Sequence, residues 1–287
     1  MTDTILVTGG TGNIGRHLVD HLRAAGAPFR VLARRPATAV KELPAGTAVT
    51  PGDLTDPGSL GPALATVDRV FLLWPALKSG GIDDVVGTLA GAGVRQVVYV
   101  SALHVTDDNR RSVGVWGEVE QAIVDAGLGW TFLRASGFAT NTLGWAPAIR
   151  AGEPVRIPYP LAKRSLIHEA DIAAVAAAAL TGDHIGRSYV LTGPAAISQA
   201  DQVAAIGAAI GRPVRHVEQP PDEARAAMTA WADAAWADQA LAYWAELVER
   251  PEPVTATVEE ILGRPARSFE RWAADHADDF RAVSPPG

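Results

Sequence analysis

The sequence predicts an α/β protein built on a doubly wound parallel sheet, and three observations carry this prediction. Short apolar runs alternate with helix-length connections over residues 1–135. Most of these runs hold several apolar residues in a row, which is typical of parallel strands covered on both faces. A glycine cluster directly follows the first run and opens a helical stretch. Right-handed crossovers between such strands produce an open, doubly wound sheet.

Six strands are expected in this first part of the chain. They are the runs at 4–7, 29–32, 48–49, 70–73, 97–100 and 130–133. The first helix is indicated by Ile14, Leu18 and Leu22 at helical spacing, and Gly26 followed by Pro28 ends it. Further helices are expected at 58–66, 82–92 and 113–126.

Beyond residue 135 the alternation gives way to a proline-rich stretch and then to helices. The expected elements are a helix at 169–180, a strand near 189–191, a helix at 199–210 and an almost entirely helical tail at 221–280. Asp171 is expected to be the N-cap of the first of these helices. The chain is thus expected to comprise a sheet-based core, 1–135, and a smaller, mostly helical part, 136–287, interleaved with the core in one structural unit.

The composition excludes several classes of function. Of the 287 residues, 48% are hydrophobic and 20% are charged, as in globular proteins. The longest apolar run, Ile172 to Leu180, is far shorter than the roughly 20 residues of a membrane span, and no basic, apolar leader opens the chain. The lack of cysteine excludes disulfides and thiolate chemistry, and a net charge of -7 argues against nucleic-acid binding. We expect a soluble, cytoplasmic monomer or homodimer.

The glycine cluster is the most informative segment. Gly9, Gly12 and Gly15 are spaced three apart, directly after a strand and at the start of a helix. In a dinucleotide-binding turn, the first glycine permits the tight turn, the second lets the backbone approach a pyrophosphate, and the third lets the helix pack close to the strand. The first-turn N–H groups and the helix dipole then attract the phosphates. The pattern predicts a Rossmann-type nucleotide site.

The end of the second strand distinguishes the two nicotinamide cofactors. A carboxylate there binds the ribose 2′-hydroxyl of NAD, whereas an arginine accommodates the 2′-phosphate of NADP. This strand ends in Arg34 and Arg35, with no carboxylate. Because arginine binds phosphate through paired, charge-assisted hydrogen bonds, NADP is favoured over NAD, with Arg34 as the contact. Solvated surface arginines are the alternative interpretation.

These residues resemble the atypical short-chain dehydrogenase/reductases of the NmrA-like group, which includes NADPH-dependent quinone reductases and triphenylmethane-dye reductases. The resemblance covers nearly the whole chain, from ILVTGGTGNIGRHLV through VVYVSAL and RASGFATN to GRPARSFERW. It implies a substrate-binding or lid role for 136–287. It also implies cofactor contacts from Gly9, Thr11, Gly12, Asn13, Ile14, Arg34, Asp53, Leu54, Leu73, Trp74 and Ser101. Phe138 and Asn141 match a loop that closes over the nicotinamide and the acceptor.

The acid of the wider superfamily is missing from its usual place. Ordinary members use a Tyr and a Lys four residues apart on a helix to protonate a carbonyl oxygen. At the matching positions this chain has Trp116 and Glu120. One such pair does occur, Tyr159 and Lys163, but the prolines that flank Tyr159 predict extended backbone there, so we treat it as coincidence.

An enzyme without this acid needs an acceptor that stabilises negative charge itself. Quinones, enones and extended aromatic compounds do so by delocalisation, and catalysis then depends on positioning. His104 is a candidate proton donor because histidine titrates near neutrality, although a locally bonded loop histidine is the simpler interpretation. Trp116 and Trp145 are candidates for an aromatic acceptor wall, or for ordinary packing.

Four alternatives to this function are weighed, and the redox sensor is the strongest of them. The chain could bind NADP(H) without turnover and act as a redox sensor for a regulatory partner, as some relatives of this group do. A nucleotide-sugar epimerase is disfavoured because its chemistry needs the tyrosine. Metal binding by His17 and His21 is disfavoured since no third ligand accompanies them, and no GxSxG motif supports hydrolase chemistry.

Overall fold

The computed structural model describes residues 3–281, and the chain divides into two compact units. The first contains the chain up to Ala135 together with Glu169–Leu191 and Thr257–Arg264. The second contains Ser136–His168, Thr192–Ala256 and the chain from Pro265 onward. Within the described residues, no helix combines the length and the apolar character that a membrane span requires.

The first unit is built on a seven-stranded parallel sheet, as the sequence predicts. The strand order is β3-β2-β1-β4-β5-β6-β9, so the order reverses between β1 and β4. The strands are β1 (Ile5–Val7), β2 (Phe29–Ala33), β3 (Val49–Pro51), β4 (Arg69–Leu72), β5 (Gln96–Ala102), β6 (Gly129–Ala135) and β9 (Arg187–Leu191). In such sheets, ligands bind at the carboxyl ends of the strands where the order reverses.

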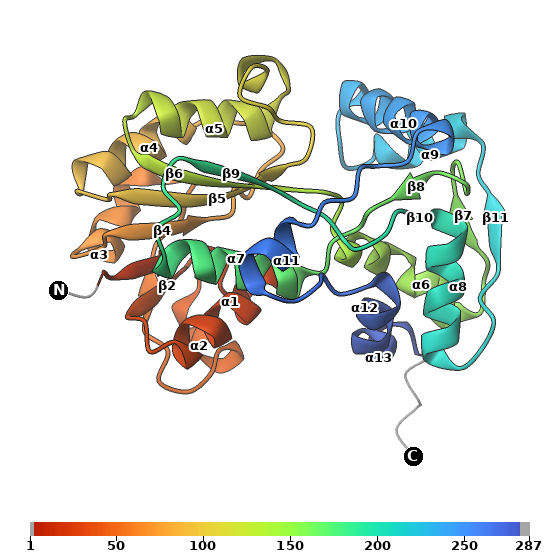
Figure 1. Ribbon diagram of the computed structural model, residues 1–287, viewed down its shortest axis with the longest axis horizontal. Helices are drawn as coiled ribbons and strands as arrows, with labels where there is room; N and C mark the ends of the chain where they lie inside the picture. The colour runs from red at the N-terminus through yellow and green to blue at the C-terminus, as the bar shows by residue number, and fades with distance from the viewer. Residues whose placement is uncertain (1–2, 282–287) are drawn as a thin grey trace. The chain divides into compact units, whose positions relative to one another are not determined.

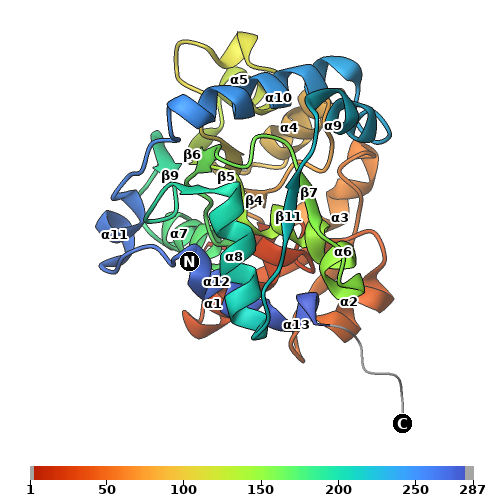
Figure 2. The same ribbon diagram turned by 90° about the vertical axis from the view of Figure 1, so that its right-hand side faces the viewer.

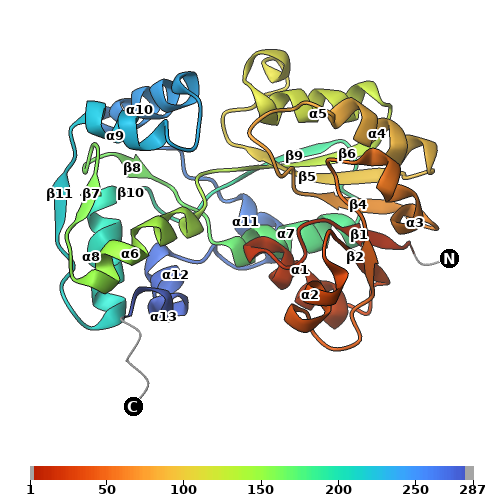
Figure 3. The same ribbon diagram turned by 180° about the vertical axis from the view of Figure 1, so that it is seen from behind.

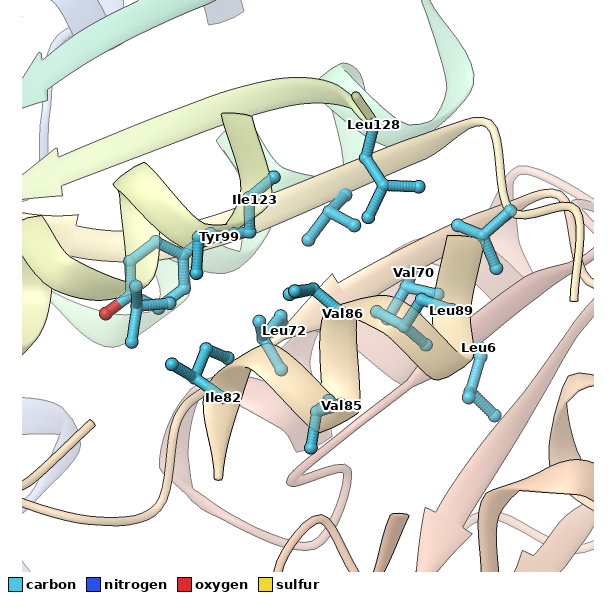
Figure 4. Close-up of a cluster of buried hydrophobic side chains, with 14 of the residues drawn as sticks. Leu6, Val70, Leu72, Ile82, Val85, Val86, Leu89, Tyr99, Ile123 and Leu128 are labelled. Atoms are coloured by element: carbon cyan, nitrogen blue, oxygen red, sulfur yellow. The ribbon is translucent and has the colours of Figure 1, made fainter. Parts of the chain in front are cut away.

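Helices cover both faces of this sheet (Figure 1). On one face lie α1 (Asn13–Ala24), α2 (Pro36–Glu42) and α7 (Glu169–Thr181); on the other lie α3 (Gly61–Leu64), α4 (Ile82–Gly91) and α5 (Val115–Asp125). A short helix, α11 (Thr257–Leu262), contacts α7 and β9. Figure 4 shows the core of the second face, where Val85 and Leu89 of α4 pack against the strand residues Val70 and Leu72. Their burial excludes water from both layers and drives their association.

Three expectations for the first unit need correction. The helix expected at 58–66 is a 3₁₀ turn, η1 (Pro57–Leu60), followed by the four residues of α3. The helix α2 went unpredicted because its seven residues include no apolar stripe. Asp171 is not an N-cap: it lies in the first turn of α7, fully buried, and its Oδ1 accepts a hydrogen bond from Arg264 at 2.8 Å.

The second unit combines two small strand pairs with helices. β7 (Val155–Ile157) pairs in parallel with β11 (His216–Glu218), which Figure 2 shows side by side. β8 (Lys163–Arg164) pairs antiparallel with β10 (Ile197–Ser198). The helices are η3 (Ala139–Trp145), α6 (Ala146–Ala151), α8 (Gln199–Ile210), α9 (Pro221–Met228), α10 (Ala234–Glu249), α12 (Phe269–Asp275) and α13 (Ala277–Phe280). α8 lies against α12 and α13, where Trp272 is fully buried (Figure 3).

The tail is less helical than the sequence indicates. Irregular segments at 250–256 and 263–268 separate α10, α11 and α12. The proline-rich stretch holds the short strand β7 and, beyond it, a turn. Tyr159 in that turn has a φ of 51°, so the expectation of extended backbone there was wrong, although the segment is not helical either. The carbonyl of Tyr159 accepts a hydrogen bond from the N–H of Ala162, which closes the turn.

Candidate active site

The glycine loop joins β1 to α1, and its backbone is packed so closely that the glycine positions have little room for a Cβ atom. Gly9 has a φ of 65°, a conformation that glycine adopts without steric cost. A Cβ atom on Gly15 would lie 2.1 Å from the carbonyl oxygen of Gly9, so the helix packs directly on the loop backbone. A Cβ atom on Gly12 would lie 3.2 Å from the same oxygen. The loop is therefore compact, and because glycine has no side chain, nothing projects from these three positions over the loop backbone.

Hydrogen bonds fasten this loop at the point where the strand order reverses. The N–H of Thr8 donates to the carbonyl of Phe71 at 3.1 Å. The hydroxyl of Thr8 accepts the N–H of Leu73 at 2.9 Å. The carboxyl ends of β1 and β4 are thus held together, and the loops that follow them open on the same edge of the sheet.

A crevice of about 410 Å³ lies at this edge of the sheet, and we call it the strand-end crevice. Seven of the predicted cofactor residues line it: Gly9, Thr11, Arg34, Asp53, Leu54, Leu73 and Trp74. Four others do not: Gly12, Asn13, Ile14 and Ser101. Sequence reasoning assigned no role to several lining residues, including Thr8, Gly10, Thr38, Thr55 and Ala76. Except for Thr38, which lies in α2, they closely follow strand ends, and this adjacency is the signal that could have found them.

The crevice carries both signs of charge. Arg34 and Arg35 lie at the end of β2, and Asp53 follows β3. The pKa of Asp53 lies below its usual value, chiefly because the N–H of Thr55 donates to its Oδ1 at 2.9 Å, with a smaller contribution from Arg34. Asp53 is therefore ionised at neutral pH, and one of its oxygens is committed to the turn.

Two predicted acceptor residues of the first unit lie together after β5. The imidazole of His104 and the indole of Trp116 meet edge to face, with ring centroids 5.4 Å apart. His104 is exposed as a residue, yet partial burial of its imidazole lowers the pKa of this side chain. A hydrogen bond with the backbone of Val113 raises the pKa and offsets this effect only in part. Ser101, at the end of β5, has a buried hydroxyl with no hydrogen-bond partner among residues 3–281.

Glu120, the residue predicted to stand in place of the superfamily lysine, belongs to a buried ionic cluster. Its side chain is fully buried, and Oε1 and Oε2 accept hydrogen bonds from Arg134 at 3.0 and 2.8 Å. Arg110 donates to Oε2 at 3.0 Å. Asp107 accepts from both arginines at 2.6 and 2.7 Å, which ties the loop after β5 to β6. The cluster therefore fixes the segment that carries His104.

The other three predicted acceptor residues belong to the second unit and follow one another along η3. Phe138 is the N-cap residue of η3, and its carbonyl accepts the N–H of Asn141 at 3.0 Å. Asn141 is exposed, whereas Phe138 and Trp145 are half-buried. The N–H of Ala139 donates to the carbonyl of Ile167 at 2.9 Å, so the start of η3 is held by the segment that follows β8. Among the described residues, no group of His, Asp and Glu has the arrangement of a metal site.

Comparisons with known proteins agree with this architecture. A family model described as NAD(P)H-binding matches residues 9–183. A Streptomyces griseus protein named (4-alkanoyl-5-oxo-2,5-dihydrofuran-3-yl)methyl phosphate reductase is 39% identical over 284 residues, which cover 96% of this chain and 99% of the relative. An NAD(P)H azoreductase from Xenophilus azovorans is 38% identical, with 97% and 100% covered.

A solved structure gives the same result for the fold. The NADPH-dependent quinone oxidoreductase of Escherichia coli, complexed with NADPH, matches with a TM-score of 0.79 and 22% identity over 94% of this chain and 99% of the other. The predicted resemblance to quinone reductases with an NmrA-like fold is thereby confirmed. The chain belongs to the NAD(P)H-binding family and is an NAD(P)H-dependent oxidoreductase.

Proposed function

We propose that this protein is an NADPH-dependent reductase of conjugated, electron-poor acceptors such as quinones, enones and extended aromatic compounds. The observation that carries the proposal is that α5 holds Trp116 and Glu120, at the two positions where the family resemblance leads us to expect a tyrosine and a lysine. A carboxylate that is bonded to two arginines cannot lower the pKa of a neighbouring acid, and an indole cannot donate a proton to an alkoxide. Acceptors that delocalise the incoming charge need no such donor.

The printed names of the relatives support this class of acceptor. The Streptomyces compound is a dihydrofuran whose ring double bond bears both the ring carbonyl and an alkanoyl carbonyl on one carbon. The Xenophilus enzyme is named for azo compounds, in which a nitrogen–nitrogen double bond is conjugated with its substituents. Both are electron-poor double bonds that spread negative charge over neighbouring groups. We assign the same class of acceptor to this chain.

The strand-end crevice fits a dinucleotide, and we assign its residues accordingly. Gly9 and Thr11 bring backbone N–H groups to the pyrophosphate, beside the N-terminus of α1, whereas Gly12, whose own N–H donates to the carbonyl of Gly9 at 2.9 Å, lets the backbone approach the pyrophosphate closely. Arg34 binds the 2′-phosphate, which favours NADP over NAD. Asp53 and Leu54 contact the adenine. When bound, the nicotinamide supplies a hydride.

The remaining site residues have positioning roles in this proposal. Leu73, Trp74 and Ser101 contact the ribose and nicotinamide, with Asn13 and Ile14 at the pyrophosphate. The buried hydroxyl of Ser101 supports this assignment, because a buried polar group without a partner costs free energy that a ligand can recover. We assign contacts with the acceptor to His104, Trp116, Phe138, Asn141 and Trp145. The lowered pKa of His104 supports an uncharged imidazole that orients the acceptor.

The test is NADPH oxidation by the purified chain with a panel of quinones, an azo dye, an α-acyl butenolide and a simple ketone. We expect turnover with the conjugated acceptors and none with the ketone, which needs a proton donor. Equal turnover of the ketone would contradict the proposed mechanism. NADPH binding without oxidation by any acceptor would overturn the reductase and favour the redox sensor.

A further inference from the structure

The second unit contains a cavity of about 180 Å³ that none of the dinucleotide-binding residues line. Five of its lining residues are large and apolar or aromatic: Trp145, Ile157, Met228, Trp231 and Trp244. We call it the aromatic cavity. We propose that the aromatic cavity binds one uncharged aromatic ring, as a site separate from the strand-end crevice.

The size of the cavity suits a single ring. In another protein, an engineered apolar cavity of about 150 Å³ takes up benzene. A cavity of 180 Å³ thus has room for one six-membered ring with a small substituent.

The walls favour an aromatic ring over an aliphatic one. Three indoles and a methionine thioether line the cavity. Aromatic pairs gain from edge-to-face and offset contacts beyond the area they bury, and a thioether packs favourably on a ring. An aliphatic group of equal size gains only the burial of its area.

Charge selects a neutral ligand. The one charged lining residue is Arg156, and its guanidinium forms an ion pair with Glu223 of α9. A cation would meet this guanidinium, and an anion would compete with a carboxylate that already neutralises it. The two glutamines in the wall, Gln199 and Gln219, carry no charge.

The cavity is held open by two separate packing clusters. Met228 belongs to a cluster between α9 and α10, where Arg225 and Asp238 form a two-point ion pair at 2.6 and 3.0 Å. Trp145 packs instead against the larger core around Trp272. The cavity therefore lies between two clusters that each pack around their own interior. At its edge Trp231 is 62% exposed, an apolar surface that a ring would cover.

The binding test uses saturation-transfer NMR of the full chain with three probes: benzyl alcohol, cyclohexylmethanol and benzoate. We expect transfer to benzyl alcohol and a clear loss of transfer for the other two. The variant is Ala227→Trp, because Ala227 is an exposed cavity-lining residue of α9 and a new indole there fills the space. Its matched control is Ala226→Trp, the exposed neighbour that does not line the cavity.

Ala227→Trp should abolish transfer to benzyl alcohol, and Ala226→Trp should leave it unchanged. Equal transfer to cyclohexylmethanol, or undiminished transfer in Ala227→Trp, would overturn the proposal. The measurement involves no turnover, so its failure is distinct from failure of the proposed reductase function.

A second measurement identifies the source of the ring. If the ring belongs to an acceptor, Ala227→Trp raises the KM of a phenyl-substituted benzoquinone but not that of unsubstituted benzoquinone. If the ring belongs to a separate monocyclic aromatic compound, both KM values stay unchanged while the binding signal is lost.

Discussion

The two units hold two hollows of opposite chemistry. The strand-end crevice of the first unit is bounded by a glycine loop, two arginines and the carboxylate of Asp53. The aromatic cavity of the second unit is bounded by indoles and a thioether, with its one arginine paired. The crevice is formed by loops that expose backbone N–H groups at strand ends, whereas the cavity is a gap between two packed clusters. The first suits a charged, phosphorylated ligand and the second a neutral ring.

Each unit also contains a buried glutamate bonded to arginine, Glu120 in the first and Glu252 in the second, and the two differ in how many charges they neutralise. Glu120 bonds two arginines, Arg110 and Arg134. Glu252 of the second unit bonds one, Arg164 at 3.1 Å, and also accepts from the hydroxyl of Tyr243 at 2.7 Å. Burial and the nearby carboxylate raise the pKa of Tyr243, so its phenol stays protonated as a donor. The first unit thus depends more heavily on buried charge.

The largest expected effect on stability comes from removing the buried glutamate of the first unit. Glu120→Ala leaves two largely buried guanidiniums with only Asp107 between them, so the free energy of unfolding should fall by about 3–5 kcal/mol. Glu252→Ala should cost less, because it leaves a single guanidinium uncompensated. Chemical denaturation followed by circular dichroism measures both. A larger loss for Glu252→Ala would contradict the comparison.

The next effect concerns the charge of the strand-end crevice. Arg34→Glu removes charge-assisted hydrogen bonds to the 2′-phosphate and adds a repulsive carboxylate, so the Kd for NADPH should rise roughly 10- to 100-fold. The Kd for NADH should change little, since NADH has no 2′-phosphate. Calorimetric titration with both coenzymes measures the ratio.

The neighbouring arginine supplies the control for this assignment. Arg35 also lines the crevice, and Arg35→Glu should shift the two Kd values by similar, smaller factors. If Arg35→Glu instead discriminates against NADPH as strongly as Arg34→Glu, the 2′-phosphate contact belongs to Arg35. Equal effects of Arg34→Glu on both coenzymes would refute a phosphate contact at that position.

The fold of the first unit could be predicted because its signals are local. A buried parallel strand is a short apolar run, and each of the six runs expected before residue 135 became a strand of the sheet. The second unit lacks such signals. The two residues of β8 and the three of β7 are too short to show a pattern, and they pair with segments at 197–198 and 216–218. Pairing over such distances leaves no trace in a local window.

The residues of the two candidate sites likewise divide into those that local sequence signals predict and those that only the fold brings together. Gly9, Arg34, Asp53 and Leu73 each follow a strand, so a rule about strand ends predicts that they converge. The aromatic cavity combines Trp145 with residues of α9 and α10 about 80–100 positions later, and only the folded unit brings them together. The ion pairs of Glu120 are likewise invisible in the sequence, because nothing local indicates which arginine reaches a buried carboxylate.

A smaller effect tests the close packing of the glycine loop. The added methyl group of Gly15→Ala would overlap the backbone of Gly9 and Gly10, which cannot move aside as a side chain can. We expect a loss of about 1–3 kcal/mol in unfolding free energy, with weakened NADPH binding. Gly87→Ala in α4 is the control, because no atom lies within 4 Å of its added methyl group; it should stabilise by about 0.5–1 kcal/mol. If both variants changed the free energy of unfolding equally, the loop backbone would have moved to accommodate the added methyl group.

The smallest expected effect decides whether the first unit uses its histidine as an acid. The lowered pKa of His104 makes the ring neutral at pH 7 and above, so a rate that required the imidazolium would fall as the pH rises through that lowered value. Because a delocalised acceptor needs no such donor, His104→Asn should retain kcat, and wild type and variant should show the same flat profile from mildly acidic to neutral pH, the range that contains the lowered pKa of His104. Asparagine keeps a hydrogen-bond donor for orientation, so His104→Phe, which has none, should raise KM with kcat preserved. A fall in kcat of the wild type as the pH rises from mildly acidic to neutral, absent from both variants, would instead assign the proton to His104 and extend the acceptors to ordinary ketones.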